Sequence, residues 1–156
     1  MAGKGAVLAS RILNEVSSLG LVVARVENAW KKAAANNDGF YFDSVALNIH
    51  SFYSGLERVF EKIASAVDSS QPQGINWHKE LLNQMALEIP NVRPAVISEK
   101  TCKQLDNYRG FRHVVRNVYS YHINPDKMKP LAKGIRLTFK QVEKELTAFS
   151  RFIQDK

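Results

Sequence analysis

The sequence lacks several features that would place it in a particular class of protein. It has 156 residues and one cysteine, Cys102, so neither an internal disulfide nor a cysteine-based zinc site can form. It contains no run of about 18 apolar residues, the length that predicts a transmembrane helix. The first residues, Met1 to Gly5, lack the basic, apolar and cleavage regions of a secretory signal. We therefore expect a soluble, cytoplasmic protein with no membrane partner.

Signals for cofactors, strands and repeats are also missing. The eight glycines form no phosphate-binding loop. His50 and His78 are far apart, and no acidic residue joins them at metal-ligand spacing. We therefore expect neither a metal nor another cofactor. The alternation typical of strands is almost absent, and no internal repeat or domain linker is visible. A chain of this length can bury its own core, so we expect one domain over 1–156.

The main pattern in the sequence is helical. Apolar residues recur every three or four positions in four long segments and one short segment. The predicted helices cover about 8–30, 45–67, 77–87, 98–121 and 130–153. Asp43 or Ser44 is the expected N-cap of the second helix and Ser98 that of the fourth, and Pro130 suits the first turn of the last. Because the loops are short, the sequence predicts an all-α fold, an antiparallel up-and-down helical bundle of four long helices plus one short helix.

Positive charge is concentrated in one third of the chain. The whole sequence has a net charge of +7. Between Arg93 and Lys140, eleven basic and three acidic residues give +8, so the remainder is close to neutral. A basic region of this kind favours an anionic partner, most often a nucleic acid. An ordinary solvated surface with the same composition is the alternative.

The segment from Tyr108 to His122 carries most of the chemical information. At about 100° per residue, one face holds Arg109, Arg112, His113, Arg116, Asn117 and Ser120. The opposite face, expected to be core, holds Phe111, Val115, Val118 and Tyr121. Only Arg109 has an acidic residue one turn away, Asp106. Three mutually repelling guanidinium groups favour an anion over this face, although a solvated charged face is also common.

This segment resembles the active-site helix of HEPN-domain proteins, specifically the HepT-like branch. Phe111, Arg112 and His113 match the opening of the family motif, and Tyr119 matches its closing tyrosine. Asn117 stands where the family has a histidine. The second-helix pattern of the branch is matched within Ala46 to Phe60 by Asn48, His50, Phe52, Tyr53 and Glu57, and a feature of some members by Trp77 and His78. The resemblance covers roughly Val45 to Phe139.

The resemblance implies the toxin of a toxin–antitoxin pair, a metal-independent RNA endonuclease that acts as a homodimer. It also implies a nucleotidyltransferase-type antitoxin as the partner. Carried onto this sequence, it makes Arg112 the ligand of the scissile phosphate. Arg109 and Arg116, on the same basic face, are the further candidate RNA-binding residues. His113, Asn117 and Tyr119 complete the candidate catalytic set. Tyr119 is also the candidate acceptor of AMP groups that would block the RNA site.

Because Asn117 replaces the family histidine, another group must take the proton from the 2′-hydroxyl or give one to the 5′-oxygen during RNA cleavage. An asparagine side chain does not titrate and so cannot act as a general acid or base. His113, beside Arg112 on the basic face, is the preferred substitute. His122 offers a second register after Arg116, but that register loses the match at Tyr119, and we expect His122 to be structural.

Two other interpretations remain open. The module has lost catalysis and binds RNA or a nucleotidyltransferase without cleaving, or it is a structural bundle without a site.

Four further residues or segments have a predicted role. Gly55 and Gly110 are predicted to lie at close helix contacts. Glu57 either faces the basic helix as a counter-charge or lies on an exposed helix surface. The aromatic run 40–42 is expected to cover one end of the bundle rather than to stack on bases.

Overall fold

The fold is described from a computed structural model that places residues 3–155. These residues form α1 (Lys4–Asn36), α2 (Gly39–Ile63), α3 (Trp77–Met85), α4 (Glu99–Asn117) and α5 (Pro125–Gln154). A π-helical turn, η1 (Ala64–Asp68), extends α2, and a 3-10 turn, η2 (Ser120–His122), precedes α5. Within 3–155 the only β-type pairing is one isolated bridge between Ile89 and Arg93. The predicted all-α bundle is confirmed.

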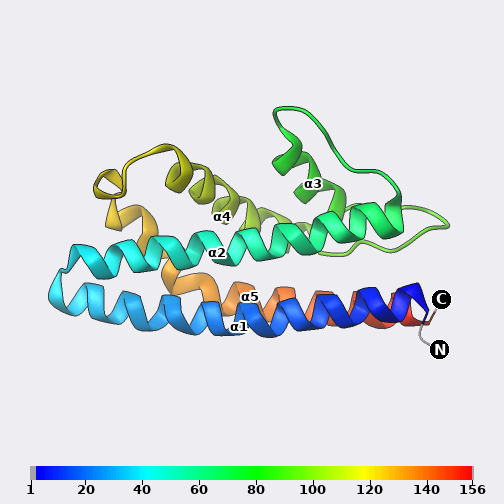
Figure 1. The fold of residues 1–156 in the computed structure, drawn as a ribbon, viewed down its shortest axis with the longest axis horizontal. Coiled ribbons are helices and arrows are strands. Elements are labelled where there is room, and N and C mark those ends of the chain that lie inside the picture. The colour runs from blue at the N-terminus through cyan, green and yellow to red at the C-terminus, as the bar shows by residue number, and fades with distance from the viewer. Residues whose placement is uncertain (1–2, 156) are drawn as a thin grey trace.

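Three long helices lie side by side and the two others cover one of them (Figure 1). α1 packs along both α2 and α5, and the chain ends lie at the same end of the molecule. α3 and α4 pack on α2, and α4 also reaches α5. The buried apolar side chains of all five helices form one cluster. α3 and α4 are thereby held next to each other on the surface of α2, and the candidate site lies there.

Among the described residues, α1 is the one helix that meets a length and hydropathy criterion for a membrane span. It contains an 18-residue window with a mean hydropathy of 1.4, enough by length and composition to cross a membrane. The periodic apolar residues of α1, however, are buried against the bundle: Leu8, Ile12, Val16, Leu19, Val23 and Val26. A helix buried along one stripe in this way is typical of a bundle core.

The hairpin between α1 and α2 is tighter than the sequence predicted. α2 begins at Gly39, not after Asp43 or Ser44. Asn37 adopts a left-handed conformation with φ 47°, which ends α1. The Asp38 carboxylate then accepts a hydrogen bond from the Phe40 backbone N–H at 2.9 Å. Because an asparagine tolerates the left-handed region and an aspartate is a good N-cap, two residues are enough to reverse the chain.

The predicted boundary between the last two long helices was wrong on both sides. α4 ends at Asn117, four residues before Tyr121, and Val118 is extended with φ −130° and ψ 158°. α5 starts at Pro125 instead of near Pro130, because the Asn124 side chain caps the Asp126 N–H at 2.9 Å. A proline at the first helical position costs no hydrogen bond. The chain reverses direction between Asn117 and Pro125, and the extended backbone at Val118 ends α4.

The predicted N-cap of α4 was correct, and it also ties α4 to α5. The Ser98 hydroxyl oxygen accepts a hydrogen bond from the Thr101 N–H at 3.1 Å. Glu145 of α5 accepts from the Ser98 N–H at 2.7 Å and from the Thr101 hydroxyl at 2.8 Å. These contacts satisfy donors that a helix start otherwise leaves unpaired.

The two helix glycines differ in their surroundings. A Cβ atom at Gly55 would lie 2.7 Å from Cδ2 of Leu19 and 2.9 Å from Oε1 of Glu15, so α1 and α2 approach closely there, as predicted. A Cβ atom at Gly110 would meet nothing within 4 Å. The close contact predicted at Gly110 was therefore wrong, because this side of α4 faces no other helix.

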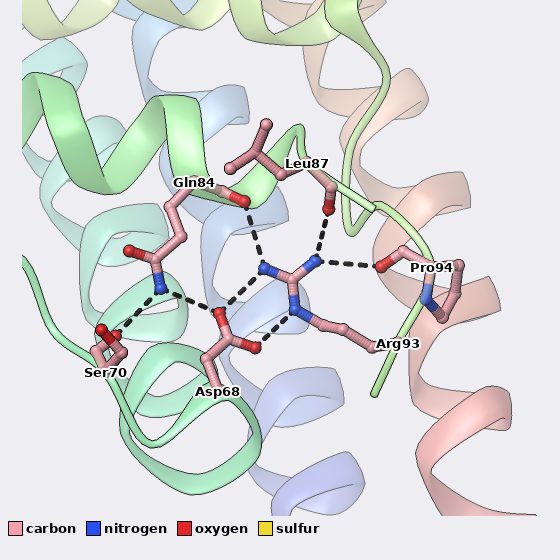
Figure 2. A network of polar contacts seen from close by, with 6 residues as sticks. All are labelled: Asp68, Ser70, Gln84, Leu87, Arg93 and Pro94. Atoms are coloured by element: carbon pink, nitrogen blue, oxygen red, sulfur yellow. Dashed lines mark hydrogen bonds and ion pairs between the residues drawn. The ribbon is translucent and has the colours of Figure 1, made fainter. Parts of the chain in front are cut away.

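Arg93 is buried and holds the link between α3 and α4 (Figure 2). Its guanidinium donates to both carboxylate oxygens of Asp68, at 2.6 and 2.8 Å. The remaining donors reach the carbonyl oxygens of Leu87, Pro94 and Gln84 at 2.7, 3.0 and 3.1 Å. All five N–H donors of an arginine are thus used. Arg93 was counted in the basic region of the sequence, but because it is buried it adds no charge to the surface.

Candidate functional site

A groove on the surface of α3 and α4 brings together most of the predicted site residues. It encloses about 340 Å³ and is lined by His78, Arg109, Arg112, His113, Arg116 and Asn117. Five of these residues lie on one face of α4, as the helical spacing predicted. The sixth, His78, comes from α3. No acidic residue is part of this lining, so the groove is positively charged and suited to an anion.

Arg112 is the most firmly held arginine of the groove. Its Nε donates a hydrogen bond to the Ser54 hydroxyl of α2 at 3.1 Å. Its NH2 nitrogen lies 3.8 Å from Oε1 of Glu57, and the side chain is only 14% exposed. These contacts fix the guanidinium before a ligand binds.

Glu57 lies buried beneath the groove. Of its two predicted positions, facing the basic helix or on an exposed helix surface, the first is therefore correct. Its side chain is 5% exposed, and it is the counter-charge of the basic helix. Its second oxygen, Oε2, lies 2.7 Å from Nδ1 of His78. The imidazole of His78 also packs on the Trp77 indole, with ring centroids 3.7 Å apart and planes 30° apart. One carboxylate therefore contacts both Arg112 and His78.

His78 is the functional candidate that sequence reasoning did not select. Twenty-one positions separate it from Glu57, so no short motif could join them. The available signal was the Trp77–His78 pair, which the family resemblance had already picked out. Only the packing of α3 against α2 shows that His78 reaches the groove.

The other two arginines of the groove differ in their partners. Nε of Arg109 lies 2.7 Å from Oδ1 of Asp106, the pairing that the sequence predicted. Within residues 3–155, Arg116 makes no ion pair, and it is exposed. The charge of Arg116 is thus the most available one for an anion in the groove.

Asn117 is bonded to its own helix. Its side-chain amide donates to the His113 carbonyl oxygen at 2.7 Å and lies 3.3 Å from Nδ1 of the His113 ring. Both side chains are exposed. The structure therefore places His113 and Asn117 together at the outer edge of the groove.

Tyr119 lies beyond the end of α4, because that helix stops at Asn117. Its side chain is 72% exposed and stacks on Tyr121, with ring centroids 5.8 Å apart. Val118 and Tyr121 were predicted to face the core, but they are 40% and 77% exposed. The prediction assumed a helical spacing of about 100° per residue, which does not hold for Val118 and Tyr121 because α4 ends at Asn117.

His122, the histidine of the second register, and Ser120, the last member of the predicted face, lie near that end as well. His122 is exposed on η2 and packs edge-on against Tyr121, with ring centroids 4.3 Å apart, so it does not point toward the core. The side chain of Ser120 lies outside the described part of the chain.

Two α2 side chains next to the site have shifted pKa values. Burial lowers the pKa of His50 below its usual value, and the charges of Arg112 and Arg116 lower it further. Both effects favour the neutral form of His50. Tyr53 is fully buried and burial raises its pKa, so it stays a neutral phenol. Within 3–155 no three His, Cys, Asp or Glu side chains converge as a metal site would require.

Comparison with known proteins places these residues in one family. The family model described as HepT-like protein matches residues 44–153, which include α2 to α5 nearly completely and every residue of the groove. No curated protein and no solved structure matches the chain significantly. Since the family model covers well over half of the sequence, the chain belongs to the HepT-like family.

Proposed function

We propose that this protein is the ribonuclease toxin of a toxin–antitoxin pair, cleaving RNA without a metal ion. The observation that carries the proposal is the groove itself, in which three arginines and two histidines converge and no carboxylate contributes to the lining. Positive charge near a phosphate stabilises the pentacoordinate phosphorus that forms when a 2′-hydroxyl attacks it. Cellular RNA as the substrate implies action in the cytoplasm.

The five groove residues of α4 each have a role in this reaction. Arg112, held by Ser54 and Glu57, binds the scissile phosphate in a preset orientation. Arg109 and Arg116 bind the RNA backbone on either side. His113 transfers a proton, and the Asn117 amide holds the neighbouring helix turn in place.

We propose a homodimer as the active form. Leu47 is 62% exposed although it is apolar, and it lies on the same face of α2 as His50 and Ser54. A second copy covering Leu47 on this face of α2 would bring two grooves close together and bury apolar area that water now contacts.

RNA cleavage is the direct test of this function. Incubating the purified protein with tRNA or mRNA in the presence of a chelator is expected to yield fragments with 2′,3′-cyclic phosphate ends, because the 2′-oxygen is the nucleophile. Intact RNA at high protein concentration would contradict the ribonuclease.

A binding module without catalysis is the second candidate, favoured by the asparagine at position 117. It would retain intact RNA, with an affinity that falls steeply as salt rises, because phosphate contacts release counterions. A salt-independent affinity would argue against any nucleic acid partner.

Tyr119 is the proposed site of control by a nucleotidyltransferase antitoxin. Its side chain is exposed and so accessible to another protein, and an added AMP would bring negative charge just beyond the last turn of α4, which carries Arg116. Co-expression with the partner is expected to add the mass of AMP to Tyr119 and to reduce RNA cleavage. Tyr121→Phe should leave the modification intact and Tyr119→Phe should abolish it. AMP on a peptide without Tyr119 would refute this assignment.

A further inference from the structure

A carboxylate from α2 holds the histidine of α3 in the orientation of a general base. Nδ1 of His78 lies 2.7 Å from Oε2 of Glu57, whose side chain is 5% exposed. An ionised carboxylate accepts hydrogen bonds but cannot donate one, so the proton of the neutral imidazole lies on Nδ1. Nε2 then carries the lone pair. Because His78 lines the groove, Nε2 is the ring nitrogen available to a molecule bound there.

Trp77 restricts the same ring from one face. The indole and imidazole centroids are 3.7 Å apart, and the planes are inclined by 30°. An indole face also stabilises a cation next to it, here the imidazolium that forms when His78 accepts a proton. The hydrogen bond and the ring contact together set the orientation of His78 before any ligand binds.

The carboxylate of Glu57 also connects this histidine with the phosphate ligand. Its Oε1 lies 3.8 Å from the guanidinium of Arg112 while Oε2 bonds His78. Among the described histidines, His78 is the one with a carboxylate within ion-pair distance. Nδ1 of His113 instead faces the amide of Asn117 at 3.3 Å. The groove thus holds two histidines in different environments, one oriented by a charge and one not.

We propose that His78 is the general base of RNA cleavage and Glu57 its positioning residue, an assignment that rests on the ribonuclease function proposed above. Nε2 of His78 takes the proton of the 2′-hydroxyl as the 2′-oxygen bonds to phosphorus. The bond from phosphorus to the 5′-oxygen breaks, and His113 donates a proton to that oxygen. The products are a 2′,3′-cyclic phosphate and a 5′-hydroxyl, and exchange with solvent restores both histidines. A histidine outside the α4 motif thereby takes the place left by Asn117.

His78→Asn separates the chemical role of the ring from its structural one. The asparagine amide keeps an N–H for Glu57 but offers no nitrogen that accepts a proton. Under single turnover with saturating RNA, the variant is expected to cleave at least about 10²-fold more slowly, with the Kd for RNA unchanged. Added imidazole should restore part of the rate of His78→Ala. His122→Asn, which alters an exposed histidine outside the groove, is the matched control and should cleave normally.

Glu57→Gln tests the positioning role. It is expected to slow cleavage, and its effect should be smaller in the His78→Asn background than in the wild type, because the part that acts through His78 is already lost there. Circular dichroism verifies that each variant is folded.

The outcomes distinguish the two levels of the proposal. Wild-type cleavage rates in His78→Asn would overturn the role of His78 and leave the ribonuclease intact. Slow cleavage with weakened RNA binding and no rescue by imidazole would also overturn it, in favour of a structural role. A wild-type protein that never cleaves RNA would overturn the proposed function and this assignment with it.

Discussion

Replacing Arg112 by alanine is expected to lower the single-turnover rate of RNA cleavage by about 10³-fold, in the range seen when one preorganised transition-state ligand is removed. Arg112 is the groove arginine with the firmest support, since Ser54 and Glu57 hold it and its side chain is 14% exposed. It therefore needs no reorganisation when negative charge builds up on the phosphoryl oxygens. The rate is measured by quenching a short labelled RNA at fixed times.

Two further variants make this result specific. Arg112→Lys keeps the charge but loses the planar fork of donors, so we expect it to restore only a small part of the rate. Arg136→Ala removes an arginine of α5 that pairs with Glu27 outside the groove, and it should cleave normally. Equal losses in Arg112→Ala and Arg136→Ala would show that general charge, rather than position, accounts for the effect.

Replacing Arg93 by alanine is expected to destabilise the fold by about 3–5 kcal/mol, the usual cost of leaving one member of a buried ion pair alone. The side chains of Arg93 and Asp68 are 0% and 2% exposed. The substitution removes the cation paired with the buried Asp68 carboxylate, which keeps a hydrogen bond from the Gln84 side chain, and it takes one donor from each of three backbone carbonyl groups. Urea denaturation followed by circular dichroism measures the loss of unfolding free energy.

A surface pair provides the comparison for Arg93. Arg58 lies 3.0 Å from Glu15, but its side chain is 61% exposed. Solvent screens this pair, so Arg58→Ala should cost less than about 1 kcal/mol. In contrast, Arg93→Met combined with Asp68→Leu removes both charges and should recover much of the loss. A cost for Arg93→Ala as small as that for Arg58→Ala would contradict the role of the buried network.

The arrangement around Arg93 also bears on the site. The guanidinium contacts the carbonyl groups of Gln84 and Leu87, at and just beyond the end of α3, and the carboxylate at the end of η1. It thereby fixes α3 against the extension of α2. Since His78 lies on α3 and Glu57 on α2, this network helps to set the distance between them.

The local features of this protein follow from residues that are close in sequence. Apolar residues every three or four positions were enough to predict the helices, because burial of one stripe is what stabilises them. The Ser98 cap and the Arg109–Asp106 pair involve residues three apart, so helix geometry alone brings them together. The basic face of α4 was predictable for the same reason.

Features that depend on contacts between helices were not predictable in this way. Periodicity ran on beyond Asn117, yet α4 ends there because the chain has to turn into α5, and Tyr119 is exposed as a result. Arg93 was counted as surface charge in the sequence, but it is buried and paired with Asp68. The pair was not predictable because Asp68 lies 25 residues away in the sequence. Glu57, His78 and Arg112 belong to three helices. Only the packing of α3 and α4 on α2 brings these three side chains together. Hydrogen bonds and ion pairs act over a few ångströms in space, and the separation of two residues along the chain does not reveal whether they are that close.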